Sequence, residues 1–228
     1  MAGMFVKELW RYPVKSLAGE RLESVEVGSL GLKGDRTVHV EVANCVITAR
    51  THFRLLGLQS TTGEDGSPLI NGFAFNSADA LKLVRQAAGP SAEVAYYDGP
   101  ERFDILPLLI ATDGAIEAFG HDSRRLRPNI VIGGVRGLEE REWPGRTLRI
   151  GEVLIGVRDL RGRCVMTTFD PDTQEHNPSV LKDIVAKFGG KLALNCFVLK
   201  GGMVRKGDLV ELIPPELPNG SQDFNRTH

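Results

Sequence analysis

The sequence predicts a β-rich α+β fold, in which a curled sheet or barrel carries peripheral helices. Strand-like segments dominate, and they follow one another without the regular strand–helix alternation of a doubly wound fold. The chain has 228 residues, of which 42% are hydrophobic and 25% charged, as in ordinary globular proteins. That length suffices for the core of one large domain or two small ones.

Short strands and turns are expected over the first third of the chain. Val38, Val40 and Val42 alternate with polar side chains, which is the period of a half-buried strand. The Gly, Ser and Pro content of residues 61–68 predicts a loop. We expect strands at residues 4–10, 22–27, 37–42 and 45–48.

Three helices and five further strands are expected after residue 75. Asn76 or Ser77 can cap the first helix, and Gly89 ends it. Thr112 can cap the second helix, and paired glycines follow the third. The helices are expected at residues 77–88, 113–119 and 179–188. The strands are expected at residues 129–132, 147–150, 153–157, 196–200 and 209–213.

Charge and cysteine content argue against several classes of protein. The net charge is −1 at pH 7 and the pI is near 6.5, so no nucleic acid and no membrane is expected as a partner. No apolar window reaches the length of a membrane helix, and residues 1–7 lack the layout of a signal peptide. Three widely spaced cysteines do not suit a disulfide framework, so a cytoplasmic location is expected.

The most informative stretch is residues 161–173, with the sequence RGRCVMTTFDPDT. It places Cys164 among arginines and before an acidic segment, residues 170–173, that is expected to form a turn. A thiolate is the form of cysteine that binds metals, and nearby guanidinium groups favour it. Arginines also match phosphate oxygens two at a time. The stretch indicates a metal or sulfur centre whose cofactor carries a phosphate, whereas Cys45 and Cys196 are expected to be buried hydrophobes.

Common catalytic and nucleotide-binding motifs are missing, namely GxGxxG, the phosphate loop, CxxC, HExxH and GxSxG. The remaining signal consists of short segments at expected strand ends and turns, where functional groups usually sit on a rigid scaffold. These segments are Tyr12-Pro-Val-Lys-Ser16, Gly34-Asp-Arg36, Thr48-Ala-Arg50, Arg127-Pro-Asn-Ile-Val-Ile132 and Gly207-Asp208.

Together with the cysteine stretch, this ordered set resembles the MOSC-domain family, a module named for the C-termini of molybdenum cofactor sulfurases. Within that family it is most similar to the mitochondrial amidoxime-reducing component and its bacterial relatives, over about residues 4–213. The resemblance implies a MOSC-type β-barrel with peripheral helices at residues 76–213, preceded by a MOSC N-terminal-like β-rich region at residues 1–75. Residues 214–228 are expected to form a disordered tail.

The resemblance also implies a molybdenum cofactor, Mo-molybdopterin, with Cys164 as metal ligand and catalytic residue. A soft thiolate suits a metal that dithiolene sulfur already binds. By matching positions, the residues that would hold the pterin and its phosphate are Lys15, Ser16, Arg36, Arg127, Asn129 and Arg163. The implied activity is reduction of N-hydroxylated small molecules such as hydroxylamines and amidoximes.

Departures from the family pattern keep other functions open. Relatives commonly have a Thr-Ser pair before the proline that corresponds to Pro107, whereas this chain has Ile105 and Leu106, so two hydroxyl contacts to the cofactor are missing. No iron–sulfur segment is found, and electrons are expected from a separate donor protein of ferredoxin, cytochrome or flavin type. The alternatives are a sulfur carrier or transferase with a persulfide on Cys164, and a cofactor carrier without turnover.

Overall fold

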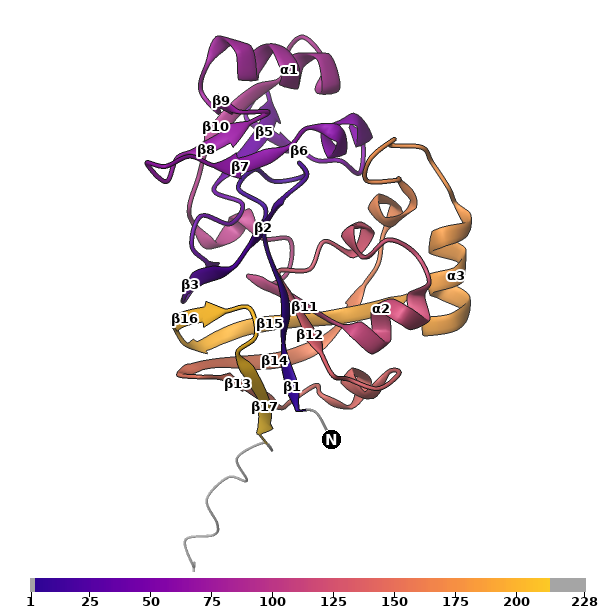
Figure 1. The fold of residues 1–228 in the computed structure, drawn as a ribbon. Helices are drawn as coiled ribbons and strands as arrows, with labels where there is room; N and C mark the ends of the chain where they lie inside the picture. The colour runs from indigo at the N-terminus through magenta and orange to yellow at the C-terminus, as the bar shows by residue number, and fades with distance from the viewer. Residues whose placement is uncertain (1–2, 214–228) are drawn as a thin grey trace, which may run out of the picture.

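The computed structural model describes residues 3–213, and in it seven strands close into a barrel (Figure 1). The strands are β1 (Met4–Arg11), β11 (Leu108–Thr112), β12 (Ile130–Gly133), β13 (Thr147–Ile150), β14 (Val153–Gly162), β15 (Lys191–Lys200) and β17 (Leu209–Ile213). Their order is β12-β11-β15-β14-β13-β17-β1, and β1 pairs back with β12. Neighbours are antiparallel except β11 and β12, which are parallel. The predicted β-rich fold with a barrel is confirmed.

β1 links the barrel to the N-terminal region. Its first residues pair with β17, where Met4 lies opposite Val210, and Phe5 to Leu9 pair with β12. Its last three residues pair with β2 (Glu20–Leu22), so Leu9 pairs with both β12 and β2. The chain therefore leaves the barrel at the end of β1, which places the segment after Arg11 at the junction of the two regions.

Three small sheets make up the remaining β-structure. One contains β3 (Ser24–Gly28), β4 (Gly31–Leu32) and β16 (Gly202–Arg205); the second contains β5 (Val38–Val42), β6 (Cys45–Ile47) and β10 (Glu93–Tyr96); the third contains β7 (Ser60–Thr62), β8 (Pro68–Ile70) and β9 (Phe73–Ala74). Val38 and Val40 are fully buried, as their alternation predicts, and Val42 packs against the same core. The expected loop at residues 61–68 is instead the hairpin of β7 and β8, because Thr-Thr pairs with Pro-Leu across a short turn.

All three predicted helices form, at α1 (Ala78–Ala88), α2 (Asp113–Phe119) and α3 (Ser179–Phe188). Ser77 caps α1 by accepting a hydrogen bond from the Ala80 N–H at 3.2 Å, and Thr112 caps α2 by accepting from the Ala115 N–H at 3.1 Å. α2 and α3 bury apolar faces in one shared cluster beside the barrel (Figure 1).

The strands β14 and β15 are longer than expected at residues 153–157 and 196–200. The extension of β14 contains polar residues such as Arg158 and Asp159, which hide the strand period, and bulges interrupt its pairing beyond Val157. The start of β15 that was not predicted, residues 191–195, is instead mostly apolar and buried. The extension of β14 delivers the chain directly to Cys164. That residue is followed by a short 3₁₀ helix, η5 (Val165–Thr168).

Two further expectations concern single features. Cys196 is buried as expected, but Cys45 is exposed, because it lies beside the turn that joins β5 to β6. No helix among residues 3–213 has the length and apolar character needed to cross a bilayer. The domain boundary at residue 75 stays a prediction, and the expected tail at 214–228 lies outside the described residues.

Candidate functional site

The structure brings all of the predicted site residues to one cavity of about 160 Å³, where the N-terminal region meets the barrel. From the N-terminal side it is lined by Lys15, Ser16 and Arg36, and from the barrel side by Arg127, Asn129, Arg163 and Cys164. These residues span almost 150 positions of sequence but share one wall. Each is placed by the end of a strand or by the turn beside it.

Cys164 directly precedes η5, and its backbone is fixed by the residues that follow. Its carbonyl accepts hydrogen bonds from the Thr167 N–H at 3.0 Å and from the Thr167 hydroxyl at 2.8 Å. The side chain is partly exposed and faces Arg50. Burial lowers the pKa of Arg50, but Asp104 and Cys164 raise it more, so the net shift is upward. The cysteine is therefore accessible and held beside a permanent positive charge.

Positive charge dominates the lining of the cavity. Eight lysine and arginine side chains reach it, against one carboxylate among the described lining residues, that of Asp104. The cationic residues are Lys15, Arg36, Arg50, Arg102, Arg125, Arg127, Arg161 and Arg163. Because the whole chain is nearly neutral, this concentration of charge is local. The chemistry of the lining matches an anionic ligand.

Arg127 and Arg163 each have a buried guanidinium nitrogen in the site. The Arg163 guanidinium donates from Nη2 to the Leu126 carbonyl at 2.8 Å, and that of Arg127 lies 4.2 Å from the centre of the Tyr12 ring. Burial lowers the pKa of each to about 10, so both remain charged at neutral pH. Arg127 Nη2 and Arg163 Nε have no hydrogen-bond partner among the described residues. Buried donors in this state are costly, and an anion would satisfy them.

Arg36 has a partner within the chain. Its guanidinium pairs with the fully buried carboxylate of Asp35 and lies 5.0 Å from the centre of the Tyr12 ring. Asp35 also accepts a hydrogen bond from the Tyr12 N–H at 2.8 Å. Burial raises the pKa of Tyr12 to about 12, so the phenol is neutral and donates to the Pro128 carbonyl at 3.2 Å. Part of the Arg36 charge is thus compensated before any ligand binds.

Lys15 and Arg50 both contact Asp104. Lys15 Nζ lies 2.8 Å from Asp104 Oδ1 and donates to the Arg102 carbonyl at 2.9 Å. Arg50 Nη2 lies 2.6 Å from Asp104 Oδ2, and Arg161 Nη2 approaches the same oxygen to 4.0 Å. Burial raises the pKa of Asp104, but the hydrogen bond from Lys15 and the three nearby cations outweigh it and hold that pKa below its usual value.

The side chains of Ser16 and Asn129 bond mainly to the backbone, and Asn129 Oδ1 also accepts a hydrogen bond from Arg36 Nη1 at 3.4 Å. Ser16 Oγ accepts from the Ala49 N–H at 3.0 Å. Asn129 Oδ1 accepts from the Leu109 N–H at 3.1 Å, and its Nδ2 donates to the Trp10 carbonyl at 3.3 Å. Both residues line the cavity, but the contacts that they make hold the walls in place. Their role in binding a cofactor stays a prediction.

Four cations of the cavity were not among the predicted site residues. Arg50 and Arg161 lie within the segments that the sequence singles out, so their position near the site was available as a signal. Arg102 has no such signal, and it donates to the backbone carbonyls of Leu30, Asp35 and Gly99. Arg125 falls in an arginine-rich run before Arg127, but nothing in that run distinguishes it.

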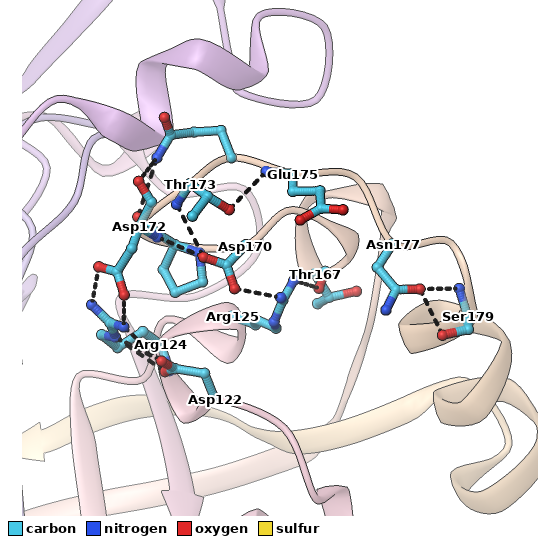
Figure 2. A network of polar contacts seen from close by, with 12 residues as sticks. Asp122, Arg124, Arg125, Thr167, Asp170, Asp172, Thr173, Glu175, Asn177 and Ser179 are labelled. Carbon is cyan, nitrogen blue, oxygen red and sulfur yellow. Dashed lines mark hydrogen bonds and ion pairs between the residues drawn. The ribbon is translucent and has the colours of Figure 1, made fainter.

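The acidic segment after η5 forms a turn, as expected (Figure 2). Asp170 Oδ1 accepts hydrogen bonds from the N–H groups of Asp172 and Thr173, each at 3.0 Å. Arg125 joins this turn to the cysteine segment, because it contacts Asp170 Oδ2 at 2.9 Å and the Thr167 carbonyl at 3.3 Å. Asp170 and Arg125 therefore hold the loop that follows Cys164.

Histidine, cysteine and carboxylate side chains do not gather in any group of three or more that could hold a metal ion, within residues 3–213. A metal at Cys164 would therefore need ligands from outside the protein. The cationic lining and the two unsatisfied arginine donors fit a cofactor that carries both such ligands and a phosphate.

Comparison with known proteins agrees with this arrangement. Mitochondrial amidoxime reducing component 2 from Homo sapiens is 25% identical over 227 residues, covering 74% of this chain and 67% of the relative. The Bos taurus protein of the same name is 25% identical over 232 residues, with the same coverage. The solved structure of the YUAD protein from Bacillus subtilis matches with a TM-score of 0.52 and 14% identity, over 92% of this chain and 96% of that one, which concerns the fold alone.

Two family models match the chain and together span both of its regions. The model of the MOSC N-terminal beta barrel domain matches residues 3–85, and the model of the MOSC domain matches residues 113–211. The chain therefore belongs to the MOSC-domain family.

Proposed function

We propose that this protein is a molybdenum-cofactor-dependent reductase of N-hydroxylated small molecules such as hydroxylamines and amidoximes. The observation that carries the proposal is the pair of unsatisfied buried donors, Arg127 Nη2 and Arg163 Nε, in a cationic cavity that also exposes Cys164. MOSC domains are associated with the molybdenum cofactor, and the curated relatives are named for amidoxime reduction. Their identity of 25% supports the activity only at the level of the family.

The residues present suit this cofactor. Cys164 would bind the metal, and Arg127 and Arg163 have donors free for its phosphate or pterin. Lys15 and Arg36 would add charge, although each already contacts a carboxylate. The further predicted contacts are Ser16 and Asn129. When bound, the cofactor would supply the two-electron redox chemistry at its metal.

The chain itself would bind the cofactor, orient the substrate and shield both from solvent. Ile105, which is 42% exposed, and Arg50 line the same cavity as Cys164, so an apolar side chain and a cation would face an incoming substrate. Neither Asp104 nor Tyr12 suits the role of proton donor at neutral pH, because the pKa of the first is below its usual value and that of the second is about 12. Protons for the reduction would then come from solvent at the exposed side of the site.

Among the described residues of the cavity lining, Cys164 is the only redox-active group. Electrons would therefore come from a separate ferredoxin-, cytochrome- or flavin-type protein. The cytoplasmic location expected from the sequence stays a prediction.

A second candidate function is supported by the apolar replacement beside the cavity. Ile105 and Leu106 line it where relatives commonly have two hydroxyl residues, which removes donors for a cofactor. An accessible Cys164 beside Arg50 is also the arrangement of a persulfide-carrying sulfur transferase. The third alternative, a cofactor carrier without turnover, shares the binding residues of the first.

Metal analysis tests the proposal directly. The wild type and the variants Cys164→Ala and Cys45→Ala would be purified from a host that makes molybdenum cofactor. We expect near-stoichiometric molybdenum in the wild type and in Cys45→Ala, which removes an exposed cysteine outside the cavity, and loss in Cys164→Ala. Loaded protein should then reduce an aromatic amidoxime with a reduced viologen as electron source.

The alternatives give different results in the same experiment. Folded wild type without molybdenum would overturn the reductase, and alkylatable sulfane sulfur on Cys164 would then support the sulfur transferase. Stoichiometric molybdenum without turnover under any reductant would support the carrier.

A further inference from the structure

Asp104 occupies the place in the cavity where an anionic ligand would be expected. It is the single carboxylate among the described residues of the lining, and its two oxygens face Lys15 at 2.8 Å and Arg50 at 2.6 Å. Arg161 lies 4.0 Å away as a third cation. The geometry is that of an anion in a site built of cations, except that the anion belongs to the protein.

The segment that carries Asp104 is weakly tied to its surroundings. It lies between a 3₁₀ turn, η2 (Pro100–Arg102), and β11, and no backbone hydrogen bond involves Asp104 or Ile105 among the described residues. The Asp104 side chain is 28% exposed. Releasing this carboxylate to solvent would therefore break its contacts with the cations but no backbone ladder.

Two of the remaining cations of the cavity are less compensated. Arg127 and Arg163 lack partners for one donor each, and neither pairs with a carboxylate among the described residues. A small anion that entered the cavity could either satisfy these two or displace Asp104 from the other three. A larger ligand that carries a phosphate could do both at once, because all five cations line the same cavity.

We propose that Asp104 is a specificity-determining residue, an internal competitor that holds Lys15, Arg50 and Arg161 and is displaced only by a ligand whose phosphate is part of a larger molecule. A free phosphate ion that binds at Lys15, Arg50 and Arg161 must replace the carboxylate with its own contacts alone, so its affinity for these three cations is low. A ligand anchored elsewhere in the cavity meets the same competition but offsets it with its other contacts. The inference rests on the proposed binding of a phosphate-bearing cofactor, but it concerns the protein to which that cofactor is not bound.

Phosphate binding to the metal-free protein tests this inference. Isothermal titration with inorganic phosphate would compare the wild type with Asp104→Asn, at constant ionic strength in a Tris buffer that contains no carboxylate. We expect at least a tenfold gain in phosphate affinity in Asp104→Asn, because the three cations lose their internal partner. Asp104→Glu keeps the charge and should bind as weakly as the wild type. Glu101→Gln makes the same charge change three residues away, outside the lining, and should leave the affinity unchanged.

Each contrary outcome is distinct. Asp104→Asn that binds phosphate no more tightly than the wild type, or more weakly, would show that the carboxylate only positions the cations, and this would overturn the proposal. If Asp104→Asn does not fold, Asp104→Ser provides a second neutral variant, with the circular dichroism spectrum as the check on folding. The proposal requires that phosphate bind Lys15 in Asp104→Asn. A gain in phosphate affinity that persists in the double variant Asp104→Asn, Lys15→Met would therefore also contradict the proposal. Molybdenum content is measured separately, so failure of the proposed function does not imitate any of these results.

Discussion

Asn129 tests how the cavity wall is held together, because its side chain forms hydrogen bonds with two backbone groups of neighbouring strands. Oδ1 accepts from the Leu109 N–H at 3.1 Å, and Nδ2 donates to the Trp10 carbonyl at 3.3 Å, while the Asn129 side chain is almost fully buried. Asn129→Ala would leave both groups unsatisfied next to β11 and β1. Each buried unsatisfied group costs about 1–3 kcal/mol. We expect a loss of about 3 kcal/mol in the free energy of unfolding.

A loss of that size corresponds to a fall in Tm of roughly 6–12 °C for a chain of this length. Asn195 supplies a matched control, because it is also a buried asparagine of the cavity lining. Its amide bonds only to the side chains of Asp159, at 2.5 Å, and Arg161, at 3.2 Å, which are partly exposed and can turn to water. Asn195→Ala should cost only about 1 kcal/mol.

Urea denaturation of the two variants, followed by circular dichroism, measures both losses. Equal losses at the two positions, or a loss below about 1 kcal/mol for Asn129→Ala, would refute the reasoning. Asn129 would then be better explained as a ligand-facing residue whose contacts with the walls are weak.

Three further results are expected. Gly114→Ala should destabilise the protein by about 1–3 kcal/mol, although alanine favours helices, because the new Cβ would lie 2.4 Å from the Gly137 carbonyl oxygen; thermal unfolding measures this. Arg125→Ala should speed the alkylation of Cys164 by iodoacetamide, because it frees the loop that follows; an unchanged rate by mass spectrometry would contradict this. The stability that Asp104 adds should be lost as the pH falls below about 4, because its pKa is lower in the folded than in the unfolded chain; a stability difference from Asp104→Asn that grew with acid would oppose it.

Local features of the fold could be predicted from the sequence because local physics decides them. Val38 and Val40 alternate with polar residues and are buried, and Thr112 caps the helix that its position predicts. The polar end of β14 could not be predicted in this way. Arg158 and Asp159 resemble loop residues until the two strands pair, and only the pairing shows Asp159 opposite Asn195.

The site, like the fold, has features that the local sequence predicts and features that depend on contacts between distant residues. The motifs single out Lys15, Arg36 and Cys164, and the structure brings these three side chains to one cavity, since each motif lies at a turn whose position follows from the strands around it. Motifs cannot show which charges are already compensated. The contact between Lys15 and Asp104 joins residues 89 positions apart, and it depends on a segment without regular structure. The pairing of Arg36 with the fully buried Asp35 likewise cannot be read from the motif, because it depends on how the two side chains are buried in the cavity wall.

Backbone strain connects these site residues to one another. Ser16, Arg36 and Arg127 have φ angles of 74°, 56° and 55°, in the left-handed region that favours glycine. Each such conformation costs an L-residue about 1–2 kcal/mol. The strained backbone turns the chain at a strand end, so it directs the side chain into the cavity instead of along the strand.

A pair of substitutions at Arg127 isolates this strain. Arg127→Ala and Arg127→Gly remove the same guanidinium, but only glycine adopts a φ of 55° without a steric penalty. We therefore expect the glycine variant to be more stable than the alanine variant by about 1 kcal/mol, as measured by urea denaturation. Arg125, in the 3₁₀ helix η3 (Ser123–Leu126), should show the opposite order, because its backbone is not left-handed. Equal stabilities of the two Arg127 variants would mean that the left-handed turn is not held in solution, and that Arg127 is aimed by its contact with Tyr12 instead.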